Sequence, residues 1–273
     1  MNQTFSFQRF SLLVAKHWAE NKKRYLLSAV AIIGLLVMWF LFIMLTDGQY
    51  PMADGIQQVT YLFSVFGVGA FYASQYFKDL GSKSKASNYL LVPASSLEKL
   101  MCSLLYVVIF SFIAFSALFY LADFIMVSIA NAVHPSYDKD HEATVANVFT
   151  SPGISGDANM NFYFLLAFFT IQAAFLLGSI YFEKFSFIKT AISIFVVALS
   201  IFFLMYFFIE IVLPNGSYHK GFMRSYLVFV DGENDHLVQL PLWIGSVLKL
   251  LFMYAIAPLL WVVTYFRLKE KQL

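Results

Sequence analysis

Residue types that commonly perform catalysis or bind metals are sparse in this chain, and none of them has the spacing of a known catalytic motif. The sequence contains no G-x-x-x-x-G-K-[ST], so it lacks the glycine-rich loop that cradles nucleotide phosphates. It contains no H-E-x-x-H, and its five histidines fall outside the long apolar segments: His17, His134, His141, His219 and His236. These patterns argue against an enzyme, including an intramembrane metalloprotease.

The densest group of possible metal ligands lies in a polar stretch at residues 131–161. His134 and His141 flank Asp138 and Asp140, but their spacing matches no known site, and a solvated acidic loop accounts for them more simply. We therefore expect no metal site. The single cysteine, Cys102, excludes an internal disulfide and a thiolate metal cluster.

Ionisable residues at the limits of apolar segments are a second class of candidates, because charges are costly in lipid and are often functional there. Asp123, Glu210 and Lys249 hold such positions. Lys249 could form an intramembrane polar pair with Glu210, or its ammonium group could extend to the outer interface. We favour these structural roles over a role in substrate binding.

The elements that must position these residues are those of a membrane protein. Of 273 residues, 60% are hydrophobic and 12% are charged, whereas about a quarter of an ordinary soluble domain is charged. A helix needs about 20 apolar residues to cross a bilayer, and continuous apolar runs favour helices over barrel strands. We expect an all-α integral membrane protein whose residues 25–273 form one domain of six transmembrane helices: 25–45, 59–76, 100–122, 162–182, 188–209 and 242–266.

The positions of the basic residues predict how this domain is oriented, because Lys and Arg are retained on the cytoplasmic side. With the N-terminus inside, the cytoplasmic segments hold fourteen of the eighteen basic residues. Both termini are therefore predicted to be cytoplasmic. The net charge of +2 is too small to indicate nucleic-acid binding. The fourteen are Arg9, Lys16, Lys22, Lys23, Arg24, Lys78, Lys83, Lys85, Lys99, Lys184, Lys189, Arg267, Lys269 and Lys271.

Residues 1–24 precede the first predicted span and have an amphipathic pattern. On a helical wheel Phe7, Phe10, Val14 and Trp18 share one face, and charged residues occupy the other. This pattern favours an amphipathic interfacial helix over a plain basic anchor. At the other side of the membrane, residues 212–240 contain an apolar patch too short to span, which could be a re-entrant or interfacial helix or a loop over the bundle.

The second predicted span is rich in small residues, which let helix backbones approach closely within lipid. The seam could join helices of one subunit, which is the commoner case, or mark the meeting line of two subunits. Its members are Gly67, Gly69, Ala70, Ala73 and Ser74.

The connector between the second and third spans is unusually well specified. Its cytoplasmic segment, residues 82–98, carries an apolar cluster that an exposed connector would place in contact with a partner: Tyr89, Leu90, Leu91 and Val92. Pro93 disfavours helix before it, and Ser95 and Glu98 have the spacing of a capping box, so a new helix should begin near Ser96. The cluster could bind a cytoplasmic protein or rest on lipid headgroups, and local physics leaves both open.

A leucine-rich segment followed by P-A-S-x-L-E-K lies between the second and third of six spans and after an amphipathic N-terminal helix. In this motif and this layout the chain resembles permeases of the ATP-binding-cassette exporter superfamily, in the second-type family of export permeases. The layout is similar along the whole chain, but the motif itself is confined to residues 88–100. The Phe-rich style is similar to that of such permeases from Bacteroidetes-type bacteria.

This resemblance implies a permease subunit in a bacterial inner membrane, paired with a second copy or a paralogue. It implies that the connector carries a coupling helix, with Tyr89, Leu90, Leu91, Val92, Pro93, Ser95 and Glu98 at the contact with a separate ATP-binding subunit. ATP and Mg would then be bound by that subunit, and this chain would hold no cofactor. The alternative is a polytopic membrane anchor or assembly factor without transport activity. Lipid, peptide, drug and polysaccharide exporters can share such a shell, so the substrate stays open.

Overall fold

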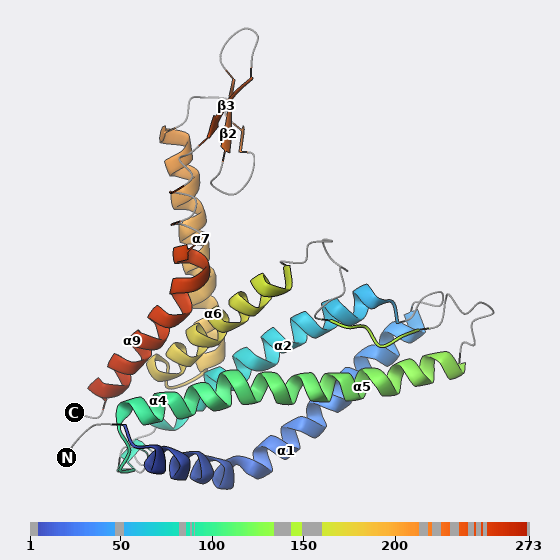
Figure 1. The fold of residues 1–273 in the computed structure, drawn as a ribbon, viewed down its shortest axis with the longest axis vertical. Helices are drawn as coiled ribbons and strands as arrows, with labels where there is room; N and C mark the ends of the chain where they lie inside the picture. Colours follow the sequence, from blue (N-terminus) through green and yellow to red (C-terminus); the bar gives the residue numbers. More distant parts are fainter. Residues whose placement is uncertain are drawn as a thin grey trace.

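The computed structural model describes residues 5–46, 52–81, 86–87, 89, 91–133, 143–148, 160–212, 218–219, 225–229, 235–239, 243, 247 and 250–271. This part of the chain is mainly helical, and a helix overlaps each of the six predicted spans (Figure 1). The helices are α1 Phe7–Thr46, α2 Asp54–Tyr76, η1 Lys78–Gly81, α4 Ser96–Leu104, η2 Leu105–Phe110, α5 Ser111–Val133, α6 Met160–Tyr181, α7 Ser186–Val212, η4 Leu250–Ala255 and α9 Ile256–Glu270.

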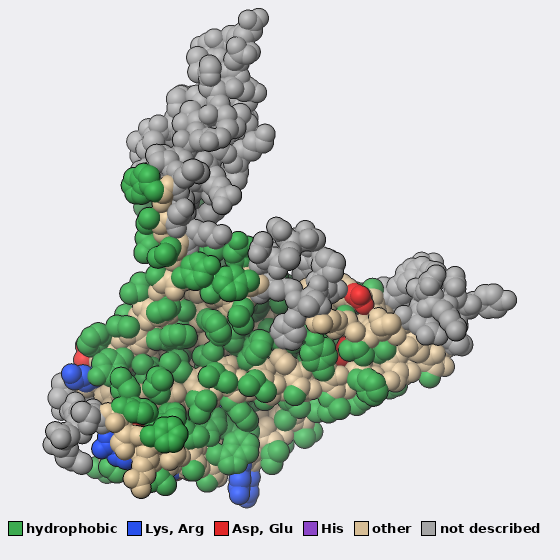
Figure 2. Space-filling view, viewed as in Figure 1, with side chains coloured by type: hydrophobic (Ala, Val, Ile, Leu, Met, Phe, Trp, Pro, Cys, Tyr) green, Lys and Arg blue, Asp and Glu red, His purple; other side chains and the backbone are tan. Residues whose placement is uncertain are grey.

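Four helices within the described residues are long and apolar enough to cross a membrane: Phe7–Thr46, Ser96–Val133, Phe162–Tyr181 and Ser186–Leu204. Hydrophobic side chains cover much of the molecular surface in Figure 2, and the basic side chains on that face lie along its left and lower edge. An apolar exterior of this extent is typical of a protein surrounded by lipid.

The predicted interfacial helix and the predicted first span form a single helix, α1, of 40 residues. No glycine or proline separates them, and the joining residues 19–24, AENKKR, are mostly good helix formers. The first part of α1, dark blue in Figure 1, lies at an angle to the rest of the helix. A change of direction therefore follows the amphipathic part without a break in the helix.

One end of the molecule, which we call the connector end, collects the starts of α1, α4 and α7 and the ends of α2, α6 and α9 (Figure 1). A Cβ on Gly81 would lie 3.0 Å from Cα of Glu183, so η1 touches the connector between α6 and α7. Lys271 Nζ donates a 3.0 Å hydrogen bond to the carbonyl of Ile180, which joins the ends of α9 and α6. Several segments were predicted to be cytoplasmic. Those that belong to the described residues thus lie together at the connector end.

The centre of the bundle is α2, which contacts α5, α6 and α7. At the end opposite the connector end, the fully buried Gln57 of α2 donates hydrogen bonds to the carbonyls of Met52 and Thr144 and accepts one from the Ala146 N–H. A buried amide needs partners for its donors and its acceptor, and Thr144 and Ala146 supply two of the partners of Gln57. These bonds hold residues 143–148 against the bundle.

A small antiparallel sheet is an addition that the sequence analysis did not anticipate. It has the order β1-β2-β3, with β1 at Tyr218–His219, β2 at Ser225–Phe229 and β3 at Asp235–Gln239. The patch within residues 212–240 that we read as a re-entrant helix or a loop is therefore a strand in its described part. Its β-branched and aromatic residues, followed by an Asp-Gly pair, are a hairpin signal that we overlooked.

Candidate functional site at the connector end

The fixed point of the connector is Glu98, in the first turn of α4. The predicted capping box is present: the Glu98 backbone N–H donates to Ser95 Oγ at 3.2 Å, and the Ser95 N–H donates to Glu98 Oε2 at 2.8 Å. The two bonds satisfy backbone donors that a helix start leaves without partners. They set the direction in which the chain leaves Pro93 and enters the helix.

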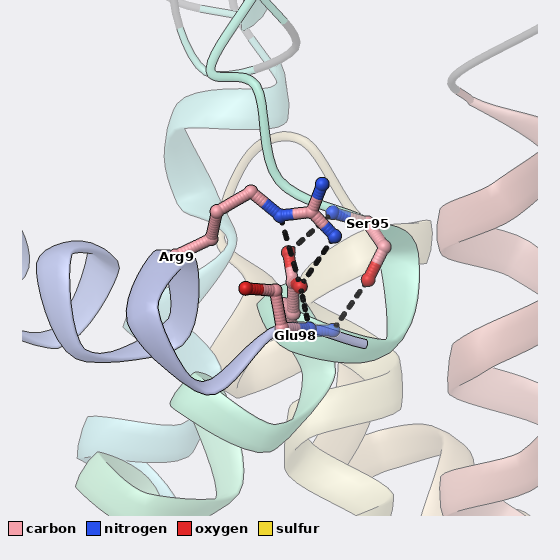
Figure 3. Close-up of polar contacts among 4 residues, drawn as sticks. Arg9, Ser95 and Glu98 are labelled. Carbon is pink, nitrogen blue, oxygen red and sulfur yellow. Dashed lines mark hydrogen bonds and ion pairs between the residues drawn. The ribbon is translucent and has the colours of Figure 1, made fainter. Parts of the chain in front are cut away.

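The second carboxylate oxygen of Glu98 binds the start of α1, far away in the sequence. Glu98 Oε1 accepts hydrogen bonds from the Ser6 N–H at 2.7 Å, from Arg9 Nε at 3.2 Å and from Arg9 Nη2 at 2.9 Å. Figure 3 shows the Arg9 side chain reaching from α1 to the carboxylate, beside Ser95. One carboxylate therefore joins the N-terminal helix, the connector and α4.

Glu98 has no exposed surface, whereas the Arg9 side chain is 39% exposed. Burial raises the pKa of the Glu98 carboxyl, but the hydrogen bonds from Ser95 and Ser6 and the charge of Arg9 together outweigh burial and hold the pKa below its ordinary value. Glu98 precedes the apolar segment 100–122, so it lies outside the predicted span. The carboxylate is accordingly charged at neutral pH.

The connector itself projects apolar side chains from this fixed base. Leu91 N–H donates a 2.9 Å hydrogen bond to the Ser87 carbonyl, which closes a helical turn before Pro93. Leu91 is 76% exposed, Pro93 is exposed and Val92 is half-buried. Leu90, another of the predicted coupling residues, lies outside the described residues, as do residues 82–85 and 88 of the predicted segment.

An open groove of about 390 Å³ runs between the connector and α1. The connector contributes Leu91, Val92, Pro93 and Ala94, and α1 contributes Arg9, Leu12, Leu13 and Lys16. The groove therefore has an apolar floor with two cations on one wall. Such a surface suits a helix or loop that presents apolar side chains and a carboxylate.

Tyr89 differs from the rest of the predicted coupling cluster, because it packs inward. Its ring lies 6.2 Å from that of the buried Phe77, and Lys99 Nζ lies 5.2 Å from its centroid. We therefore assign Tyr89 to anchoring the connector on α2 and leave Leu91, Val92 and Pro93 as its outward surface.

Four of the five small residues predicted as a helix seam are buried: Gly69, Ala70, Ala73 and Ser74. Gly69 faces α6, where an added Cβ would overlap the amide of Gln172 and approach Phe168 Cε2 to 3.0 Å. Gly67 is exposed, and nothing lies within 4 Å of a Cβ there. At Gly69 the predicted seam thus faces α6 of the same chain, and a contact of the seam with a second subunit stays a prediction.

The predicted polar pair of Glu210 and Lys249 falls outside what the structure describes. Glu210 belongs to α7, but its side chain lies outside the described residues, and Lys249 lies outside them entirely. The pair stays a prediction.

Two features of the connector end were missed from the sequence. Arg9 and Ser6 are partners of Glu98 across about ninety positions, a contact that no local spacing indicates. Phe185, between α6 and α7, has φ of 55° and a side chain that is 77% exposed. This backbone conformation is strained for a bulky residue, and such strain is found at functional positions more often than elsewhere.

Comparison with known protein families, with curated proteins and with solved structures finds no match to this chain.

Proposed function

We propose that this chain is the membrane-spanning permease subunit of an ATP-binding-cassette exporter, driven by separate ATP-binding subunits that dock on the connector end. Six helices cross a bacterial inner membrane, and both termini are cytoplasmic. The proposal rests on the resemblance at residues 88–100 and on the geometry of the connector. The transported substrate is left open.

The observation that carries the proposal is the contrast between the tip and the base of the connector. Leu91 is 76% exposed at the tip, while Glu98 at the base is fully buried and binds two other elements. Solvent-exposed apolar side chains usually have a partner. Because the base is bound to α1 and α4, a force that the partner exerts on the tip is transmitted to both helices and does not merely bend the connector.

The six-span arrangement is supported by where helices begin and end. The predicted cytoplasmic connectors lie at one end, as alternating crossings require. The helix α2 is less apolar than the four candidate spans, and one side of it packs against α5, α6 and α7. A helix covered by protein needs less apolar surface than one facing lipid.

A second permease copy or a paralogue completes the pathway. The side chains of α7 that the structure describes are largely exposed and apolar, such as Phe195, Phe202 and Leu204. In a bilayer, lipid or a second subunit covers them. ATP and Mg belong to the docking subunit, and its ATP-bound form must prefer one permease state for the cycle to run.

The test is co-purification of the tagged chain with an ATP-binding subunit carrying a Walker motif from the same cell. We expect Leu91→Asp combined with Val92→Asp to abolish the association, because two carboxylates would be buried without partners in the interface. Leu91→Met, which keeps the surface apolar, should retain it. Equal recovery of the subunit with the Asp variant and with the Met variant, at matched protein levels, would refute docking at this site.

The second candidate is a polytopic membrane anchor or assembly factor without a transport path. The exposed apolar side chains of α7 favour this candidate, because a membrane anchor needs only an apolar surface that faces lipid. Replacing residues 100–273 with unrelated spans separates the two. A permease loses its cellular function in that chimaera, whereas an anchor keeps it.

A further inference from the structure

A cavity of about 530 Å³ lies beside the connector, between α1 on one side and α2, η2 and α5 on the other. This is a common size for a small-molecule or lipid site. It differs from the docking groove in position and in most of its lining, although Leu13, Lys16 and Val92 border both. The docking function described above does not use it.

The cavity has one charged end. Its cations are Lys16 and Arg24 and its carboxylates are Glu20 and Asp79. Lys16 and Glu20 pair with each other at 3.8 Å, one turn apart on α1. Arg24 forms no hydrogen bond or ion pair with any residue that the structure describes. An exposed guanidinium at the rim of a cavity is therefore available to a ligand, and its planar fork matches a phosphate group.

The other end is apolar and is kept open by small side chains. Its lining includes Ile32 of α1, Val68 of α2, and Ala114, Ala117 and Leu118 of α5. The wider π-helical turn η2 also lines it, and turns of this kind often mark functional positions in helices. The lining therefore changes from charged to aliphatic along α1.

The length of this gradient matches a lipid leaflet. Arg24 directly precedes the chargeless segment 25–45, so it lies at headgroup depth if α1 crosses the membrane. Ile32 lies eight residues further along, which is about 12 Å at ~1.5 Å per residue. One leaflet of the hydrocarbon core is about 15 Å thick.

We propose that the cavity binds one membrane phospholipid, with its phosphodiester held by Arg24 and one acyl chain lying against Ala114, Ala117 and Leu118. Trp18 and Tyr25, which also line the cavity, are the residue types that occupy the headgroup region of membrane proteins. The site needs only that the chain be in a membrane, so it stands apart from the transport function.

Native mass spectrometry of the full chain in detergent, titrated with dioleoyl phosphatidylglycerol, tests the site. Arg24→Gln should weaken binding of the first lipid about tenfold, the usual effect of losing one charge-assisted hydrogen bond. Ala114→Phe should abolish binding by filling the acyl channel. Lys23→Gln and Ile113→Phe, neighbouring positions that do not line the cavity, are the matched controls and should bind as the unchanged protein does.

Glycerol phosphate, which has the headgroup chemistry without the chains, separates a lipid site from a simple anion site. It should not displace the lipid. The proposal is overturned if it competes as well as the lipid, or if Arg24→Gln and Ala114→Phe bind as their controls do. None of these outcomes depends on an ATP-binding subunit, so they are distinguishable from failure of the proposed function.

Discussion

At the scale of single residues, Glu98 does the most to define the connector end, because three segments meet at its carboxylate. We expect Glu98→Gln to lower the free energy of unfolding by about 2–3 kcal/mol, since an amide NH2 would face donors that now share a carboxylate. Chemical denaturation in detergent micelles measures this loss.

Arg9→Gln is the matched comparison for that measurement. Arg9 is 39% exposed, so water replaces much of its interaction with Glu98, and its loss should lower the free energy of unfolding by at most about 1 kcal/mol. A larger effect for Arg9→Gln than for Glu98→Gln would contradict the central role of the buried carboxylate.

The pH dependence follows from the lowered pKa of Glu98. A carboxyl whose pKa is lower in the folded state contributes stability above its unfolded pKa and loses that contribution as the pH falls through the folded value. The attachment of α1 to α4 should therefore persist at neutral pH and weaken only below the ordinary value of 4.5.

A thiol placed at Ser6 in a Cys102→Ala background reports this attachment. Its maleimide labelling should be slow at neutral pH and should quicken in acid, after correction for the thiolate fraction with a free peptide. The Glu98→Gln variant should label fast at every pH. Labelling that does not differ between the two proteins would show that the carboxylate does not hold the N-terminal segment.

Residue patterns predicted the capping box of Ser95 and Glu98 but not the contact of Glu98 with the start of α1. Ser95 and Glu98 are three positions apart, so the capping box follows from spacing alone. Arg9 is one of several basic residues on an amphipathic helix, and nothing in its neighbourhood indicates a partner near position 98. Contacts between distant segments depend on how α1 lies in the bundle, which periodicity does not determine.

At the scale of secondary-structure elements, the contact of α2 with α6 depends on Gly69. A side chain there would collide with Gln172 and Phe168. We expect Gly69→Leu to lower the free energy of unfolding by about 1–3 kcal/mol, as overpacking does. Gly67→Leu changes the same helix at an open position and should leave stability almost unchanged, so similar losses for both variants would contradict the seam.

The helices could be predicted because long apolar runs have few alternatives in a membrane. Their limits could not: the third predicted span ends at 122, whereas α5 continues to Val133. The sheet was not predicted because the apolar run at residues 226–230 is short enough to suit either a strand or an interfacial helix, and only the Asp-Gly pair that follows it favours a hairpin. The boundary between the interfacial helix and the first span could not be located from the sequence, because the residues there are good helix formers and continue the helix.

At the scale of the whole molecule, the two ends of the bundle carry different features. The connector end carries the exposed Leu91 and Phe185, the buried Glu98 and the start of the proposed lipid cavity. The opposite end carries Gln57 and the segment 143–148 that it holds. Docking at one end can influence the other only through helices that run between them, and α2 contacts most of these.

The most direct test of the account is the side of the membrane on which the connector lies. Leu91→Cys in a Cys102→Ala background, expressed without the ATP-binding subunit, places a thiol at an exposed position, and a membrane-impermeant maleimide is applied to intact cells and to cells with a permeabilised inner membrane. We predict labelling only after permeabilisation. Labelling in intact cells would place the connector outside the cytoplasm, where no ATP-binding subunit can reach it, and would contradict the proposed function.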